Sequence, residues 1–261
     1  MSTDTVDTLG NQKESNYALN QPNKEAFVEA VTDGLLPPPA YFGANVAMNK
    51  TGYKNVDEVI DTGLTELKPK EFETAADSTG ALILDTRDSA AFHKGFVPKS
   101  INIGINGDFA PWVGAMIGDV KQPLLIVADE GMEEEVIIRL TRVGFDNVIG
   151  YLKGGFDAWK ADDREIDTVN RITADEFKKR VNVEEDKVFD VRKETEWEAE
   201  HVEESFSRPL SNINDWMKDI NPEEHFYVHC AGGYRSMIAS SILESRGYRN
   251  FTEIEGGFDA I

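Results

Sequence analysis

The only cysteine of the chain lies in the segment YVHCAGGYRS, residues 227–236, and is the first candidate for chemistry. A thiolate is a nucleophile, and it is stabilised where loop amides and a helix N-terminus converge. An apolar run leads into Cys230, two glycines permit a tight turn, and a helix-forming segment follows. Arg235 adds a permanent cation that can face an oxyanion. The spacing therefore predicts an anion-binding loop that carries a nucleophile.

The residues between and after Cys230 and Arg235 have expected roles as well. The loop amides that bind the substrate are predicted to come from Ala231, Gly232, Gly233 and Tyr234. Ser236 is expected in the first helical turn, where its hydroxyl can reach the sulfur or a loop amide. A free cysteine is often a small buried hydrophobe. Its place at the carboxyl end of a strand, before a glycine-rich turn, favours the nucleophile.

The elements that must position this loop occur twice in the chain. LILDTR (82–87) recurs as VFDVR (188–192), and GGFDAW (154–159) recurs as GGFDAI (256–261). A period this long indicates two copies of one domain. Each copy alternates short apolar strands with helices that end at glycine, which is typical of an α/β domain. We therefore predict two parallel sheets, each with helices on both faces.

The repeats predict the domain boundaries. The first copy covers residues 66–165 and the second covers 166–261. Residues 1–65 belong to neither copy and are predicted to be an N-terminal arm or linker. Its three consecutive prolines (37–39) favour an extended polyproline segment, and the alternative is a surface arm packed on a neighbouring domain. The insertion GDFAPWVGAMIGDV (107–120) has two interpretations, packing between the copies or a wall of the Cys230 site.

The bulk composition excludes several classes of partner. A net charge of −21 argues against nucleic acid and anionic membranes, which require basic patches. The sequence has no run of apolar residues long enough for a membrane span, and its polar N-terminus does not resemble a secretory signal. One cysteine cannot form an internal disulfide, which favours a reducing, cytoplasmic location. The four histidines lack zinc-ligand spacing, so we expect no metal and no cofactor in this chain.

The combined motifs resemble those of the rhodanese-type sulfurtransferases. CAGGYRS resembles their active-site loop, FDVRKETEWEAEHVEESFSRPLS their D-x-R strand and E-[WFY]-x-x-G-H-[IV] segment, and EGGFDA their closing motif. The resemblance covers both repeats. It departs from the family at Glu200, where glycine is usual, and it stops at Ile261, before the family's last helix and strand. The second domain is expected to be active, because it carries the active-site motif. It is also expected to be C-terminally truncated, because the resemblance stops at Ile261.

The loop could hold sulfur or phosphate. Tyrosine phosphatases carry H-C-x5-R-[ST], whereas here four residues separate Cys230 from Arg235. A shorter ring of amides resembles the rhodanese loop and suits a terminal sulfur better than a tetrahedral phosphate. The sequence also offers no clear general acid for a phosphatase leaving group. We therefore predict that the loop holds sulfur rather than phosphate.

The resemblance implies a two-step sulfurtransferase. Cys230 takes sulfane sulfur from thiosulfate or a persulfide, becomes a persulfide, and passes the sulfur to a thiol or cyanide. Arg235 orients the donor, while Asp190 and Arg192 are expected to support the site as a strand-end ion pair. The first copy has no cysteine and carries four glutamates in its loop, so it is predicted to be inactive. The expected partners are small sulfur anions and low-molecular-weight thiols.

An inactive rhodanese copy followed by an active one resembles the C-terminal part of bacterial metallo-β-lactamase-fold fusion proteins of the persulfide dioxygenase type. By this resemblance, residues 1–65 are the tail of such a domain, and the chain functions in persulfide metabolism. The metal-binding H-x-H-x-D-H signature is absent, so iron-dependent oxidation is not assigned to this chain. The alternative function is a non-catalytic tandem rhodanese module that docks on a metallo-hydrolase partner domain.

Overall fold

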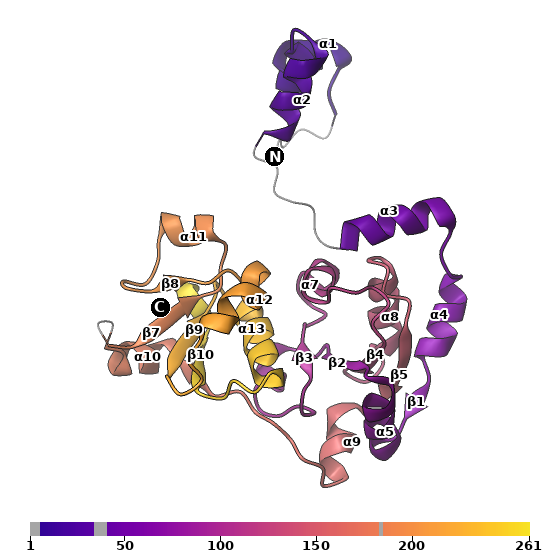
Figure 1. Ribbon diagram of the computed structural model, residues 1–261, viewed down its shortest axis with the longest axis vertical. Coiled ribbons are helices and arrows are strands. Elements are labelled where there is room, and N and C mark those ends of the chain that lie inside the picture. Colours follow the sequence, from indigo (N-terminus) through magenta and orange to yellow (C-terminus); the bar gives the residue numbers. More distant parts are fainter. Residues whose placement is uncertain (1–5, 34–40, 183–184) are drawn as a thin grey trace. The chain divides into compact units, whose positions relative to one another are not determined.

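Two parallel sheets of five strands form the framework of the protein (Figure 1). The structure is a computed structural model that describes residues 6–33, 41–182 and 185–261. The strand order is β1-β5-β4-β2-β3 in the first sheet and β6-β10-β9-β7-β8 in the second, which is the same topology twice. The predicted fold class, two α/β domains with parallel sheets, is confirmed.

The strands are short, and the central ones are almost entirely buried. The first sheet contains β1 (Glu66–Leu67), β2 (Leu82–Asp85), β3 (Ile101–Asn102), β4 (Leu124–Val127) and β5 (Val148–Leu152). The second contains β6 (Arg171–Thr173), β7 (Lys187–Asp190), β8 (Phe206–Ser207), β9 (Phe226–His229) and β10 (Phe251–Glu255). Central strands can be apolar throughout because helices cover both of their faces.

Helices cover both faces of the first sheet. In the first domain these are α4 (Val56–Gly63), α5 (Pro69–Thr79), α6 (Ser89–Phe92), α7 (Phe109–Met116), α8 (Glu133–Thr141) and α9 (Gly155–Ala161). The side chains of β4 alternate: Leu124 and Ile126 join the core that includes α7 and α8, and Leu125 and Val127 join the one that includes α5 and α9. This two-residue period follows from strand geometry.

The second domain repeats this plan. Its helices are α10 (Ala174–Arg180), α11 (Glu194–Ala199), α12 (Ile213–Trp216) and α13 (Tyr234–Ser245), with 3₁₀ turns η2 (Leu210–Asn212), η3 (Met217–Asp219) and η4 (Gly257–Asp259). Thr173 caps α10, and Glu176 bonds back to the Thr173 amide, so the predicted capping box is present.

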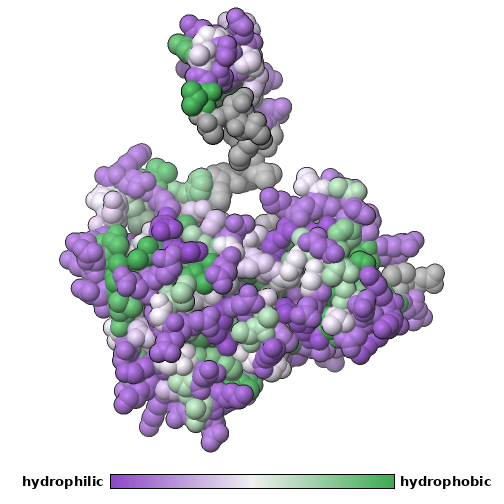
Figure 2. Space-filling view, turned by 180° about the vertical axis from the view of Figure 1, so that it is seen from behind, coloured by the Kyte–Doolittle hydropathy of each residue, from purple (hydrophilic) through white to green (hydrophobic). Residues whose placement is uncertain are grey.

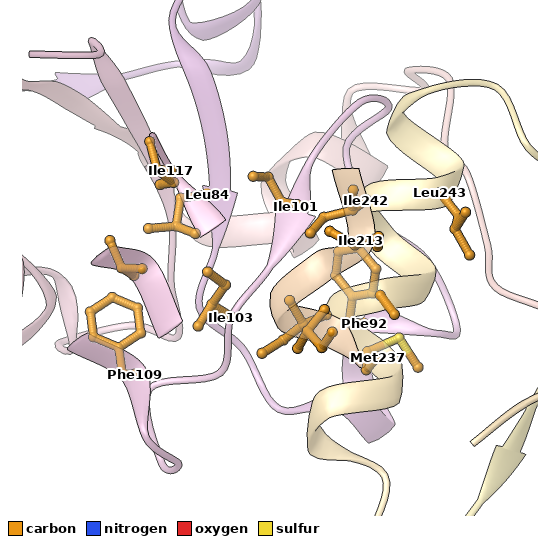
Figure 3. Close-up of a cluster of buried hydrophobic side chains, with 14 of the residues drawn as sticks. Leu84, Phe92, Ile101, Ile103, Phe109, Ile117, Ile213, Met237, Ile242 and Leu243 are labelled. Carbon is orange, nitrogen blue, oxygen red and sulfur yellow. The ribbon is translucent and has the colours of Figure 1, made fainter. Parts of the chain in front are cut away.

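One hydrophobic core runs through both domains (Figure 3). Ile101 and Ile103 of the first domain lie in the same cluster as Met237 and Ile242 on α13. A hydrogen bond crosses the same boundary, because the amide of Asn102 donates to Ser241 Oγ at 2.8 Å. The two domains therefore form one packed body, with α13 against β3.

The N-terminal 65 residues fall into two parts. Residues up to Pro39 form a separate unit, whose described elements are α1 (Leu9–Ser15), η1 (Tyr17–Asn20) and α2 (Lys24–Thr32). The rest includes α3 (Tyr41–Thr51) and α4, and α4 packs on α8 and β5 with Val59 in the core. The last part of the expected arm thus belongs to the body of the first domain. The expected polyproline segment lies outside the described residues.

Figure 2 shows that hydrophilic residues cover most of the face it draws, in line with the net charge of −21. In the described residues, no helix combines the length and the apolar character that crossing a bilayer requires.

Candidate active site

The loop that carries Cys230 joins the end of β9 to the start of α13. The parallel pairing of β9 with β7 and β10 fixes where this loop begins. Gly233 precedes the helix with φ +98°, a left-handed conformation that glycine adopts without strain. The turn therefore directs the first amides of a twelve-residue helix toward the loop.

The Cys230 thiol is buried and hydrogen-bonded within this loop. Its side chain is 1% exposed, and the Gly233 amide donates to Sγ at 3.1 Å. The Ser236 hydroxyl lies 3.5 Å from the same sulfur. A backbone amide at a helix N-terminus stabilises negative charge on sulfur. The geometry is suited to a thiolate nucleophile.

The other predicted loop residues hold the turn in place. The carbonyl oxygens of Cys230 and Ala231 accept the amides of Phe258, at 2.7 Å, and Asp259, at 3.1 Å. A Cβ atom on Gly257 would lie 2.3 Å from the Cys230 oxygen. Gly257, in the closing G-G motif, must therefore be glycine, because the chain passes directly against the Cys230 loop at this position.

Arg235 forms a bidentate ion pair that the sequence analysis missed. Its two terminal nitrogens donate to the Glu196 carboxylate at 2.6 and 2.9 Å. These hydrogen bonds from Arg235 lower the pKa of Glu196 to about 2, and the same contacts raise the pKa of Arg235. The predicted cation is present, but its charge is partly balanced. Glu196 is the glutamate that opens the E-[WFY]-x-x-G-H-[IV] segment, and this motif was the sequence signal that pointed to it.

Tyr234 reaches from the loop into the first domain. Its hydroxyl donates to the carbonyl oxygen of Gly104 at 2.7 Å, and burial raises its pKa. A Cβ atom on Gly107 would lie 2.3 Å from the Tyr234 ring, so the ring packs directly on that backbone. The side chain thus anchors the loop to the first domain, a role that the sequence did not predict.

A pocket of about 600 Å³ opens beside Cys230 and has walls from both domains. The residues that line it are Asn106, Gly107, Asp108, Trp112, Lys193, Glu196, Cys230, Gly232, Tyr234 and Arg235. The insertion 107–120 performs both of its predicted roles, because Phe109 and Val113 join the core while Trp112 and Asp108 face the pocket. No signal in the sequence singles out Lys193 or Asp108 as pocket residues.

Asp190 and Arg192 lie behind the loop and are not among the residues that line the pocket. They form the expected buried ion pair, at 2.7 Å. Arg192 also donates to the Glu200 carbonyl oxygen at 2.7 Å and stacks 4.0 Å from the centre of the Phe258 ring. These contacts join β7, α11 and η4, so the pair braces the site rather than facing a substrate.

His229 is fully buried at the end of β9. Its Nδ1 lies 3.2 Å from the Cys230 carbonyl oxygen, and its Nε2 lies 4.0 Å from Asp190 Oδ2. Burial lowers the pKa of His229, which favours the neutral ring. The ring is therefore buried beside Asp190 and is not among the residues that line the pocket.

The first domain carries an altered copy of the same loop. Val127 and His229 occupy matching positions, opposite Asp85 and Asp190, so Ala128 stands where Cys230 does. Gly131, with φ +85°, matches Gly233. The residues that follow are acidic: Glu133 matches Arg235 and Glu134 matches Ser236. This loop has the shape of its counterpart but neither its thiol nor its cation.

Comparison with known proteins supports the observation that the two halves are copies of one domain. The family model for the rhodanese-like domain matches twice, over residues 68–162 and 173–261. Among curated proteins, the chain is 30% identical over 101 residues to thiosulfate sulfurtransferase GlpE of Pseudomonas savastanoi pv. phaseolicola, covering 38% of this chain and 92% of that protein. It is 24% identical to the putative sulfur carrier protein YrkF of Bacillus subtilis, covering 34% of this chain and about half, 49%, of that protein.

Solved structures give similar matches. A thiosulfate sulfurtransferase of Pseudomonas aeruginosa is 16% identical, with 75% of this chain and 41% of that chain covered and a TM-score of 0.33. A rhodanese-like domain protein of Staphylococcus aureus is 29% identical, with 35% and 90% covered and a TM-score of 0.33.

Proposed function

The chain belongs to the rhodanese-like domain family, and from this premise we propose that its second domain is a sulfurtransferase that carries sulfur on Cys230. The observation that supports this most is the Cys230 thiol itself. It accepts the Gly233 amide at the start of α13 and lines a pocket with Arg235. A persulfide anion formed there is stabilised by the same amide and helix terminus.

The proposed reaction has two steps. The Cys230 thiolate attacks the outer sulfur of thiosulfate or a persulfide, and the donor's S–S bond breaks as the new one forms. An external thiolate or cyanide then attacks the outer sulfur and releases Cys230. The acceptor is external because Cys230 is the only cysteine of the chain. Arg235 faces the anionic donor, and Lys193 adds a second positive charge to the pocket.

A cyanide assay tests the proposal. With thiosulfate and cyanide, the wild-type protein should form thiocyanate, and Cys230→Ser should reduce the rate to background. Intact-mass spectrometry after thiosulfate treatment should show one added sulfur atom that a thiol removes. Ser240→Ala, a buried change on α13 at a hydroxyl that has no hydrogen-bond partner within the described residues, serves as the control and should keep the activity.

Two outcomes would contradict this function. Activity that survives in Cys230→Ser excludes the persulfide route. A protein that takes up no sulfur from thiosulfate or from a low-molecular-weight persulfide supports the alternative, a tandem module that binds without turnover. The family match covers the rhodanese-like domains, so a metallo-β-lactamase-fold partner, a role in persulfide metabolism and a cytoplasmic location remain predictions.

A further inference from the structure

A buried carboxylate lies beneath the Cys230 loop and has no role in the two steps above. Glu253, on β10, is 0% exposed. The Ser236 hydroxyl donates to Glu253 Oε1 at 2.6 Å, and the same hydroxyl lies 3.5 Å from Cys230 Sγ. Thiol, hydroxyl and carboxylate therefore form a continuous chain from the pocket to the sheet.

The surroundings of Glu253 favour a carboxylate that can accept a proton. Burial raises its pKa, although Arg171, whose Nε donates to Oε2 at 2.7 Å, and Ser236 act in the other direction. Glu255 on the same strand raises the pKa further, and His93 of the first domain lies near Arg171. On the other side of the chain, Arg235 faces Cys230, and Lys193 and Glu196 line the same pocket.

The first domain offers an internal comparison. Ala128 replaces the cysteine there, and Glu134 replaces Ser236. Tyr151 replaces Glu253, since Tyr151 pairs with Ile126 as Glu253 pairs with Val228 in the matching strands. All three members of the chain are therefore missing together in the copy that has no thiol. Arg171, the strand partner of Glu253, is replaced as well, by Glu66, which accepts the Tyr151 hydroxyl. The three members of the chain and the ion-pair partner of its carboxylate therefore differ together between the two copies.

We propose that Ser236 and Glu253 form a proton relay for Cys230, an inference that rests on the proposed function. When Cys230 attacks the donor, its S–H bond breaks and the proton passes to Ser236 Oγ, while the hydroxyl proton of Ser236 passes to Glu253 Oε1. A new S–S bond joins Cys230 to the outer sulfur. With thiosulfate, the electron pair of the broken S–S bond leaves on sulfite, so no oxidant or reductant is needed.

The second step reverses the relay. The acceptor thiolate takes the outer sulfur, and Cys230 leaves as a thiolate. Glu253 then returns its proton through Ser236 to the sulfur. In this scheme Ser236 contacts the reacting atom, and Glu253 acts through it as a positioning residue that stores the proton.

The pH dependence of alkylation tests the relay. Attack of the Cys230 sulfur on iodoacetamide requires loss of the thiol proton, so the rate near pH 6 reports whether the relay takes up that proton during the attack. Glu253→Gln and Ser236→Ala should be alkylated about a hundredfold or more slowly than the wild type near pH 6, in the range expected for loss of a general base. Above about pH 9, hydroxide removes the proton without the relay, and the rates should converge.

The sign of the change separates a relay from a passive charge. A carboxylate that only repels the thiolate predicts faster alkylation of Glu253→Gln near pH 6, and this result would overturn the proposal. Equal slowing at every pH would also overturn it, because that indicates reduced access to the sulfur. If Glu253→Gln does not fold because Arg171 loses its partner, Ser236→Ala decides alone, since it leaves that ion pair intact.

Two control variants lie in the same domain. Glu223→Gln removes one exposed charge from the segment before β9 and should keep the wild-type profile. Ser240→Ala removes a buried hydroxyl of α13 that has no hydrogen-bond partner within the described residues, and it should also leave the profile unchanged. Alkylation needs no sulfur donor. A wild-type protein that forms no persulfide therefore contradicts the proposed function. The alkylation profiles still test whether Ser236 and Glu253 take up the proton of Cys230.

Discussion

At the scale of single residues, the positive charge of Arg235 is partly offset by its ion-pair partner. The Glu196 carboxylate accepts two hydrogen bonds from the guanidinium. Both side chains line the pocket, with Arg235 18% exposed and Glu196 33% exposed. The depressed pKa of Glu196, about 2, means that the pair persists over the physiological range. Its contribution to stability is present above the ordinary pKa of glutamate and is lost as the pH falls toward 2. The proposed anionic donor would thus meet a cation whose electrostatic field is weakened by a neighbouring carboxylate.

Replacing Glu196 with glutamine should strengthen donor binding. Glu196→Gln removes the negative charge from the pocket rim and leaves Arg235 free to face thiosulfate, so we expect the KM for thiosulfate to fall severalfold. Stability should fall by about 1 kcal/mol or less, as is usual for a partly exposed ion pair. Steady-state kinetics and thermal unfolding measure the two effects.

Glu194→Gln, two residues earlier at the exposed start of α11, is the matched control and should change neither quantity by much. A rise in KM for Glu196→Gln would show instead that the carboxylate positions Arg235 for the donor.

At the scale of elements, the two strand–loop–helix units show which parts of the site belong to the fold. Both loops follow a central buried strand, turn through a left-handed glycine and lead into a helix. Both D-x-R pairs brace their loop in the same way, since Arg87 stacks on Phe156 as Arg192 stacks on Phe258. The differences are confined to chemistry: Ala128 in place of the thiol, and Glu133 in place of Arg235.

A thiol added to the first loop should therefore not become a sulfur carrier. We expect Ala128→Cys, placed in a Cys230→Ser background, to take up less than about a hundredth as much sulfur from thiosulfate as wild type, because Glu133 and Glu134 repel the anion. Intact-mass spectrometry measures the added sulfur.

Iodoacetamide labelling of the same variant checks that the new thiol is accessible. Uptake close to that of the wild type would show that loop shape alone, without Arg235 and Ser236, is sufficient.

At the scale of the whole molecule, the first domain completes the site of the second. It supplies Trp112 and Asp108 to the pocket and the Gly104 carbonyl oxygen that holds Tyr234. The shared core and the bond from Asn102 to Ser241 keep α13 in place against β3. A domain without a thiol is thus retained as a wall and support.

The C-terminal end of α13 makes the stability of this body depend on pH. Glu244 is 6% exposed and pairs with Arg249, which also bonds to Asp167 in the segment between the two domains. Burial raises the pKa of Glu244 to about 7. Since this value lies above that of the unfolded chain, ionisation favours unfolding, and stability should fall as the pH rises from about 4.5 through 7.

Glu244→Gln should remove this dependence. Relative to the wild type, the variant should gain up to about 3 kcal/mol in the free energy of unfolding between pH 5 and pH 8, from the size of the pKa shift. Urea unfolding at a series of pH values measures it, with the exposed Glu223→Gln as control. A difference that does not change with pH would show that the Arg249 contact outweighs the cost of burial.

The features that depend on nearby residues could be predicted from the sequence. The repeat, the buried parallel strands, the capping box at Thr173 and the Asp190–Arg192 pair each depend on residues a few positions apart or on one periodicity. The thiol in its glycine-rich turn belongs to the same class, because loop geometry is set by adjacent backbone conformations.

Only the tertiary structure decided what surrounds that thiol. Glu196 meets Arg235 across 39 residues of sequence, Glu253 meets Ser236 across 17, and Tyr234 meets Gly104 across 130. Such contacts depend on strand register and on the packing of one domain against another, and neither leaves a local pattern in the sequence. The sequence therefore located the thiol and its loop. The fold decided the ion pairing of Arg235, the carboxylate beneath the loop and the wall contributed by the domain without a thiol.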